Sequence, residues 1–248
     1  MYIASCSFGK DSLATILLAL EHNEPLDRAV FAEVMFDHKR GISGEIPEHI
    51  DWIYKTAIPK LEAMGVKVDI TRSEHDYIEQ FYYIRKNSKK TERNGKLQGF
   101  LVGGFCQMNS RGKVSAVHSY YRQFKDKEIV QYVGIAADEV KRLCRLNNKK
   151  VSLLAKYGYT EKMAMDLCKK YDLVSPLYSM GTRGGCWFCP NMRWETMQRF
   201  RKAHPELWNE LETLSRTPNL VSQNYKYEYS FSQVNARLDN MDAQQRLF

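Results

Sequence analysis

The chain has 248 residues, of which 44% are hydrophobic and 27% are charged, which is the composition of an ordinary folded protein. The mean hydropathy is −0.51 and the apolar stretch near the start is interrupted within a few residues, so we expect no transmembrane helix and no membrane association. Lys10 and Asp11 stand where a secretory signal would have its apolar core, so we expect no such signal. A formal net charge of +8 predicts an anionic partner, such as a nucleotide or a nucleic acid.

The first 70 residues alternate between strand-like and helix-like patterns. Residues 2–6 form a short apolar run that is typical of a buried strand, and helical spacing of leucine and isoleucine begins at Leu13. The next predicted elements are a strand over 28–36, a polar loop over 37–45, a helix from Pro47 to Gly65 and a strand over 66–70. This alternation predicts an α/β domain with a parallel sheet, which binds ligands at the carboxyl ends of its strands.

The rest of the chain is expected to be richer in helices. The predicted elements are a solvated basic loop over 86–96, a helix over 114–124, a strand over 129–135, a loop at 136–139 that opens a helix to Leu146, and helices from Thr160, over 194–202 and over 205–214. We therefore divide the chain into an α/β domain over 1–150, a helical region over 151–218 and a tail over 219–248. The tail has few apolar residues, and we expect it to lie along the surface or to fray.

Residues 7–12, Ser-Phe-Gly-Lys-Asp-Ser, join the first strand to the N-terminus of a helix. Unpaired backbone amides and the helix dipole attract phosphate at such a position. Gly9 lets the backbone approach the anion, and Lys10 can neutralise its charge. Ser7 and Ser12 can donate hydrogen bonds to phosphate oxygens. The loop lacks the spacing of a Walker motif, which disfavours a P-loop kinase or GTPase, and the alternative is a plain turn with a capping serine.

This loop resembles the SGGxDS signature of the PP-loop ATP pyrophosphatases, with Phe8 where glycine is more usual. Further segments resemble the phosphoadenylyl-sulfate (PAPS) reductase family, namely residues 37–48, residues 134–139 with Arg142 (Ala136 replacing the arginine of that family), and residues 104–106 with Lys113. Residues 154–161 and 183–190 look like those of uncharacterised members found in phages and mobile elements. The resemblance implies a PP-loop fold of the adenine-nucleotide α-hydrolase type.

The resemblance also implies a site for ATP or adenylyl sulfate with Mg²⁺. The nucleotide-binding residues that it implies are Ser7, Phe8, Gly9, Lys10, Asp11, Ser12, Phe36 and Gly134. Lys10, Asp11 and Glu139 are the implied catalytic residues, and Asp138 or Glu139 would hold the metal or the ribose. In the expected reaction, adenylation turns a substrate oxygen into a leaving group, which a sulfur or nitrogen nucleophile displaces. The alternative is a PAPS or adenylyl-sulfate reductase, although residues 219–248 lack the cysteine that this family carries in its tail.

Six cysteines predict a metal site or a redox site. We expect the reducing cytoplasm, where a Cys186-x-x-Cys189 pair indicates metal or redox chemistry before it indicates a disulfide. Pro190 follows the pair, as is common for iron–sulfur ligands, and zinc accepts the same spacing. The expected ligands of a [4Fe–4S] cluster or Zn²⁺ are Cys106, Cys168, Cys186 and Cys189, with Cys6 and Cys144 in the core and Cys144 as the reserve ligand. The alternatives are a thioredoxin-like redox pair and, for Cys106 and Cys168, small buried side chains.

Two smaller signals concern macromolecular partners. The basic stretch over 86–96 is either a solvated loop or a contact for nucleic acid. Residues 244–248, Gln-Gln-Arg-Leu-Phe, resemble the short peptide that binds sliding clamps, and a frayed terminus is the alternative. Together these signals give a second hypothesis, a nucleic-acid-associated protein of a mobile element that uses the nucleotide fold as a scaffold or sensor.

Overall fold

A computed structural model describes residues 1–102, 106–182 and 184–245 of the chain. The chain forms two compact units, and each unit is assembled from three separate segments. Unit 1 consists of Met1–Val34, Glu45–Glu74 and Arg111–Gly184, and unit 2 consists of Met35–Gly44, His75–Ser110 and Gly185–Phe248. The expected boundary at residue 150 falls inside unit 1, and the one at residue 218 falls inside unit 2.

Unit 1 is built on a five-stranded sheet in which every pair of neighbouring strands is parallel. The strands are β1 (Tyr2–Ser5), β2 (Arg28–Glu33), β5 (Val68–Arg72), β6 (Val130–Tyr132) and β7 (Lys150–Val151). The prediction of an α/β class with a parallel sheet is therefore confirmed. The strand order is β5-β2-β1-β6-β7, so the chain leaves β1 toward β2 on one side and meets β6 on the other. Ligands bind at such a reversal of strand order.

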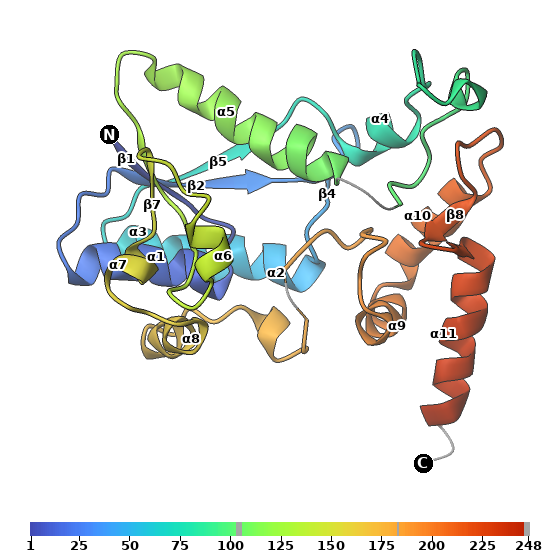
Figure 1. Cartoon of the computed structure of the whole chain (residues 1–248). Helices are drawn as coiled ribbons and strands as arrows, with labels where there is room; N and C mark the ends of the chain where they lie inside the picture. Colours follow the sequence, from blue (N-terminus) through green and yellow to red (C-terminus); the bar gives the residue numbers. More distant parts are fainter. Residues whose placement is uncertain (103–105, 183, 246–248) are drawn as a thin grey trace. The chain divides into compact units, whose positions relative to one another are not determined.

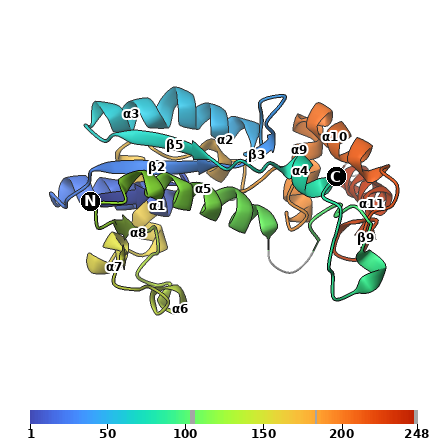
Figure 2. The same ribbon diagram turned by 90° about the horizontal axis from the view of Figure 1, so that it is seen from above.

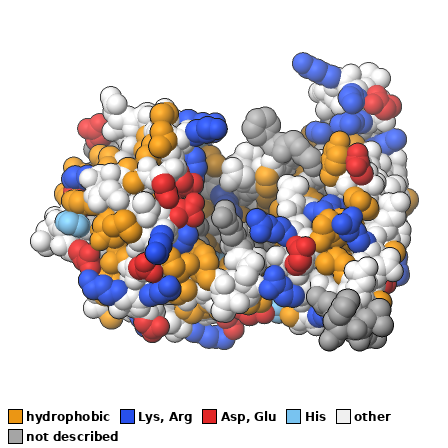
Figure 3. Space-filling view, turned by 60° about the horizontal axis from the view of Figure 1, so that its bottom comes forward, with side chains coloured by type: hydrophobic (Ala, Val, Ile, Leu, Met, Phe, Trp, Pro, Cys, Tyr) orange, Lys and Arg blue, Asp and Glu red, His pale blue; other side chains and the backbone are white. Residues whose placement is uncertain are grey.

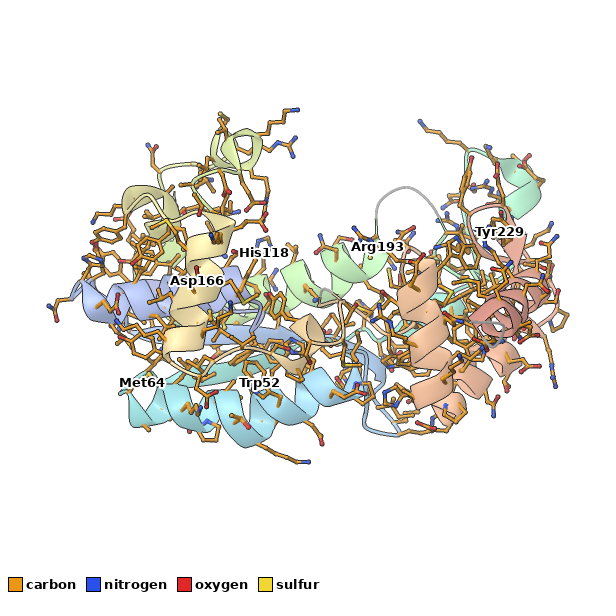
Figure 4. All side chains as sticks on the ribbon, turned by 90° about the horizontal axis from the view of Figure 1, so that it is seen from below. Trp52, Met64, His118, Asp166, Arg193 and Tyr229 are labelled. Carbon is orange, nitrogen blue, oxygen red and sulfur yellow. The ribbon has the colours of Figure 1, made fainter. Side chains whose placement is uncertain are left out.

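Helices cover both faces of this sheet (Figure 1). On one face lie α1 (Lys10–Glu21), α2 (Pro47–Trp52), η1 (Ile53–Ala57), α3 (Ile58–Ala63), α7 (Leu153–Lys156) and α8 (Glu161–Lys170). Trp52, Met64 and Asp166 mark this layer in Figure 4. On the other face α5 (Ser115–Tyr121), continued by η4 (Arg122–Phe124), packs on β2 and β5, and Figure 2 shows it in front of the sheet. The remaining elements of this part of the chain are η3 (Met108–Val114), α6 (Val140–Leu143) and η5 (Pro176–Tyr178).

The predicted helix from Pro47 to Gly65 is present but irregular. It ends as expected, because Gly65 takes a φ of +84°, a conformation in which glycine suffers no steric penalty. Its middle is the π-helical η1, and Pro59 is the second residue of the α3 segment that follows. Proline has no amide hydrogen to donate to the preceding turn, so a regular helix cannot run through this position.

Unit 2 contains two small sheets and a group of helices. Its elements are β3 (Met35–Asp37), β4 (Ile42–Ser43), α4 (Tyr77–Phe81), η2 (Thr91–Arg93), α9 (Trp194–Ala203), α10 (Pro205–Ser215), β8 (Asn224–Lys226), β9 (Tyr229–Ser230) and α11 (Phe231–Gln245). The predicted strand over 28–36 is wrong in its second half. Strand β2 ends at Glu33, and β3 pairs antiparallel with β4. An apolar run does not show where one strand stops and the next begins, because both are buried.

The prediction of a surface-lying or frayed tail over 219–248 is also wrong for most of its length. The tail forms the β8–β9 hairpin and the 15-residue helix α11. Phe231, Val234 and Leu238 are buried, at the i, i+3 and i+7 positions of one helical face. Such a thin stripe does not change the composition of the segment, which is why composition alone misjudged it. Across the described ranges, no helix is long and apolar enough to span a membrane.

Candidate functional site

A cavity of about 520 Å³ opens at the carboxyl ends of β1 and β6, where the strand order reverses. We call it the switch-point cavity. It is lined by Ser5, Ser7, Gly9, Asp11, Ser12, Val133, Gly134, Ile135, Arg142, Arg145, Leu146 and Lys150. Its volume lies in the range of about 300–1,000 Å³ that is usual for small-molecule sites. Three cationic side chains and three hydroxyls in one lining suit an anionic ligand.

Ser12 holds the loop of residues 7–12 in shape. The Ser7 amide donates to Ser12 Oγ over 3.2 Å, and that hydroxyl donates to the Gly9 carbonyl over 2.9 Å. The two serine hydroxyls lie 3.4 Å apart. Gly9 is the N-cap of α1 and supplies no capping side chain, so the helix begins without the intrinsic cap that a serine there would give. A helix N-terminus of this kind favours negative charge.

Gly134 brings the end of β6 directly against the first turn of α1. A Cβ atom at Gly134 would lie 2.6 Å from the Ser12 amide nitrogen and 2.7 Å from the Asp11 carbonyl carbon. Both atoms belong to the backbone, so neither can turn away as a flexible side chain can. The resemblance singled out Gly134 for nucleotide binding, and the structure gives the position a steric requirement for glycine.

Phe8 turns its side chain away from the switch-point cavity. Its ring has no exposed surface and meets Phe31 edge-on, with 5.3 Å between the ring centroids. Its φ is +56°, which places a non-glycine residue in the left-handed region. The backbone of Phe8 therefore belongs to the loop, while its side chain belongs to the core of unit 1.

Lys10 is held by two carboxylates. Its Nζ donates to Asp11 Oδ1 over 2.7 Å and to Glu161 Oε2 over 3.0 Å, and its amide donates to the Tyr178 hydroxyl over 2.8 Å. Burial opposes the charged form, but the hydrogen bonds and charges of Asp11 and Glu161 outweigh it and raise the pKa of Lys10. Burial raises the pKa of Asp11, against the opposing effect of Lys10. Of the two carboxylates that contact Lys10, Asp11 lines the cavity and Glu161 does not. The Asp11 carboxylate is therefore the better placed of the two for Mg²⁺.

Glu139 acts on the cavity through Arg142. Its carboxylate accepts from Arg142 Nη1 over 2.6 Å and from the Ala136 amide over 3.1 Å. Burial acts to raise the pKa of Glu139, but these partners outweigh it and lower that pKa. Arg142 lines the cavity, so Glu139 orients a cation there. Asp138, the other predicted candidate, accepts from the Glu161 amide over 3.2 Å.

Phe36 is buried elsewhere, in the core of unit 2. Its ring has no exposed surface and packs against Tyr77, Trp187 and Phe188. An adenine could stack on Phe36 only by displacing these rings. The position therefore does not enter the site that we propose.

Sequence reasoning missed His49, which contacts the backbone of the loop at Ser7. His49 is 2% exposed, and its Nε2 lies 3.3 Å from the Ser7 carbonyl oxygen. A carbonyl only accepts, so Nε2 carries the hydrogen, and Nδ1 accepts from the Ser175 hydroxyl at 2.9 Å. Burial lowers the pKa of His49, so the ring is held neutral. No sequence pattern marks this residue, because its two partners lie 42 and 126 residues away along the chain.

We expect His49 to make unit 1 less stable in mild acid. The unfolded chain binds a proton on this histidine near its ordinary pKa of about 6.5, whereas the folded chain does so only at lower pH. The contribution of neutral His49 to the free energy of unfolding is therefore complete above pH 6.5. It falls as the pH decreases, by at most about 1.4 kcal/mol per pH unit. Urea unfolding from pH 7.5 to 5.5 should show a flatter pH dependence in His49→Gln. The exposed His75→Gln variant is the control, and an equal flattening in both variants would contradict this role.

The cysteines predicted as ligands divide between the two units. Cys168 lies in the core of unit 1, where its thiol donates to the Lys10 carbonyl over 3.2 Å and burial raises its pKa to about 12. This arrangement matches the alternative of a small buried side chain. Cys106, Cys186 and Cys189 belong to unit 2. Cys6 is buried as expected, whereas Cys144 is exposed after the short helix α6, so its prediction as a core residue is wrong.

The thiols of Cys106, Cys186 and Cys189 all act electrostatically on the buried hydroxyl of Tyr77. Burial is the main cause that raises the pKa of Tyr77, and all three thiols add to it. Burial also raises the pKa of Cys189, with a further contribution from Cys106. The turn is anchored between the paired cysteines by Trp187, whose amide and indole nitrogens donate to the Gly44 and Ser43 carbonyls.

Lys226 closes the same turn from the other side, because its Nζ donates to the Pro190 and Met192 carbonyls over 2.9 and 2.8 Å. Within the part of the chain that the structure describes, no group of three or more His, Cys, Asp or Glu side chains is already arranged as metal ligands.

Several sequence signals fall outside the described residues. These are Gly104 and Phe105 beside Cys106, Arg183 before the cysteine pair, and Arg246, Leu247 and Phe248 of the clamp-like peptide. No protein-family model matches the chain, and no curated protein matches it significantly.

Proposed function

We propose that unit 1 binds an adenine nucleotide in the switch-point cavity and uses it to activate a substrate. The observation that carries this proposal is the cavity itself, which gathers the loop of residues 7–12, Gly134 and three cations at the reversal point of a parallel sheet. The resemblance of the loop to the PP-loop signature supports adenine nucleotides over other anions. ATP is our first choice, and adenylyl sulfate is the alternative.

Lining residues of different charge would bind different parts of the ligand. The hydroxyls of Ser7 and Ser12 and the N-terminus of α1 would hold the pyrophosphate, with Arg142 and Arg145 neutralising it. Asp11 would hold Mg²⁺, which would offset the negative charge of the phosphates. Catalysis then consists of placing the α-phosphorus against a substrate oxygen and stabilising the charge that develops during adenylation. The Lys10–Asp11–Glu161 contacts keep the Asp11 carboxylate in place.

The first test is calorimetric titration of Mg–ATP and adenylyl sulfate into the protein. Gly9→Ala is informative because an added Cβ would meet only Ser7 Oγ and Tyr178 Oη, both at 3.6 Å, so the fold has room for it. We expect nearly unchanged stability and about tenfold weaker binding, since the methyl group stands where the anion approaches the backbone. Arg145→Gln should also weaken binding about tenfold through loss of a charged hydrogen bond.

The matched control is Lys141→Gln, which removes one positive charge from an exposed neighbour that does not line the cavity. Binding that is equally weak in Lys141→Gln and Arg145→Gln would mean that net charge, and not the cavity, attracts the nucleotide. No binding of either nucleotide to the unaltered protein would overturn the proposal.

We also propose that Cys106, Cys186 and Cys189 hold a metal centre in unit 2. Three thiols are suitable donors for zinc or an iron–sulfur cluster, and among the described residues these thiols are not already arranged as a group of metal ligands. Protein purified without oxygen should contain stoichiometric iron and sulfide, or zinc, and Cys186→Ala should lose most of it. Cys168→Ala and the exposed Cys144→Ala should retain the metal. Equal metal content in all of these variants would contradict the site.

A further inference from the structure

A second cavity lies on the face of the sheet that α5 covers. It has a volume of about 560 Å³ and is bounded by α5, by residues 124–129 and by the ends of β6 and β7. It exists because α5 packs on β2 and β5, with Tyr120 against Ile3 and Val30, which leaves the β6–β7 side of that face without a helix of its own in the described ranges. We call this cavity the lysine groove.

The lysine groove is strongly basic. Lys113, Lys125, Lys127, Lys149 and Lys150 line it, together with the single acidic residue Glu128. Among the described residues, no ion pair joins Lys125, Lys127, Lys149 or Lys150 to a carboxylate. On the face drawn in Figure 3, by contrast, basic and acidic side chains are interspersed. Unbalanced positive charge of this kind costs self-repulsion, which a polyanion would relieve.

Apolar and aromatic side chains form the rest of the groove. Val117, Tyr121, Phe124 and Ile129 are all partly buried in its wall, and His118, which Figure 4 labels on α5, lies at its edge. Sites for single-stranded nucleic acid combine these two features, because lysines follow the phosphates while apolar and aromatic surfaces receive the bases. A small ion such as sulfate would use the lysines but not this apolar wall.

The lysine groove adjoins the switch-point cavity. Lys150 lines both of them. Gln131 lines the groove, and its Nε2 donates over 2.5 Å to the Oγ of Ser5, which lines the switch-point cavity. A polymer lying in the groove would therefore reach the place where the nucleotide is proposed to bind.

From this adjacency, together with the charge and the apolar wall of the groove, we infer that the lysine groove holds a single-stranded stretch of nucleic acid, the polymeric acceptor of the reaction in unit 1. The inference rests on the proposed nucleotide function and deepens it by naming the substrate class. A cavity of this volume takes one or two nucleotides, whereas the bases of a duplex stay paired and stacked and could not enter it. The strand would contact Lys125, Lys127 and Lys149 through its phosphates, with Lys150 at the junction.

The test is fluorescence anisotropy of labelled single-stranded RNA and DNA oligonucleotides, titrated with the full chain over a range of salt concentrations. In the variant Lys125→Gln/Lys127→Gln/Lys149→Gln we expect about tenfold or greater loss of affinity at about 0.1 M salt. The slope of log affinity against log salt should fall by about 2, since each lost contact with a single strand removes about 0.7. The matched control is Lys86→Gln/Lys89→Gln/Lys90→Gln, which removes three charges from the basic loop of unit 2.

Equal losses in the two triple variants would overturn the inference, because they would show attraction by net charge alone. Loss only in the Lys86 variant would place the contact in the basic loop, and duplex that binds as well as single strands would exclude the proposed occupant.

Titration of ATP separates this inference from the proposed function. The groove variant should bind ATP normally, whereas Lys150→Gln should weaken the binding of both ligands. If ATP fails to bind while the groove variant still loses oligonucleotide binding, the groove stands and the nucleotide function falls.

Discussion

Replacing Gly134 by alanine should disrupt both the folding of unit 1 and its binding of nucleotide. The added Cβ would lie 2.6 Å from the Ser12 amide nitrogen and 2.7 Å from the Asp11 carbonyl carbon, closer than real Cβ contacts allow. Either β6 or the first turn of α1 must move, and overpacking that has to be relieved by the backbone costs about 3 kcal/mol. Because the displaced amides belong to the proposed phosphate site, we expect nucleotide affinity to fall at least about tenfold.

Hydrogen exchange is the appropriate measurement, since a chain of two units need not unfold in one transition. Amides at residues 2–12 and 130–136 should exchange faster in Gly134→Ala, while those of unit 2 should not change. Gly185→Ala is the control because its added Cβ would meet nothing within 4 Å. Unchanged exchange and unchanged nucleotide affinity in Gly134→Ala would show that β6 and α1 do not approach each other this closely.

The parallel sheet of unit 1 could be predicted because its signals are local. Strand β1 is one apolar run, and the spacing from Leu13 to Leu18 marks a helix that is buried along most of its length. The loop between them could be identified for the same reason, since residues 7–12 form a continuous motif. Alternation of strands and helices then leaves few possible topologies, and a parallel arrangement is the commonest of them.

The partners of the site residues could not be predicted because they come from distant segments. Lys10 is adjacent to Asp11 in the sequence, but its second partner, Glu161, lies 151 residues away. The same holds for Cys168, whose helix α8 packs on α1 and so buries the thiol in the core. The spacing of cysteines in the sequence does not show which of them are close in space, and a metal requires ligands that are close in space.

The resemblance singled out positions without giving a physical reason for them. Gly134 is one example, because its steric role depends on a strand and a helix that are more than 100 residues apart. Phe36 is the opposite case. It ends a predicted strand, but the chain enters unit 2 one residue before it, and its ring is buried there. A motif therefore transfers a role only where the backbone around it also matches.

Phe8 is both a position of the loop motif and a buried side chain of the core. Its replacement should have the largest effect on stability. Phe8→Ala removes a fully buried ring that packs on Phe31, and such a change in a core costs about 3–5 kcal/mol. The φ of +56° does not reduce this loss, because alanine also carries a Cβ, and a Cβ in this conformation is disfavoured by about 1–2 kcal/mol. Glycine has no such penalty, because it carries no Cβ.

Phe8→Gly should therefore be more stable than Phe8→Ala by about 1 kcal/mol, although both variants lose the ring. At Phe31, in strand β2, the order should be reversed, because glycine in a regular strand is less stable than alanine by about 0.5–1 kcal/mol. Urea unfolding of the four variants, followed by exchange of the amides of β1 and β2, measures both differences. If alanine is the more stable replacement at both positions, the loop does not hold Phe8 in a left-handed conformation. If glycine is the more stable replacement at Phe8 and alanine at Phe31, the aromatic ring of Phe8 keeps in place a backbone conformation that glycine would adopt without strain. The loop of residues 7–12 then gains its rigidity from the core of unit 1.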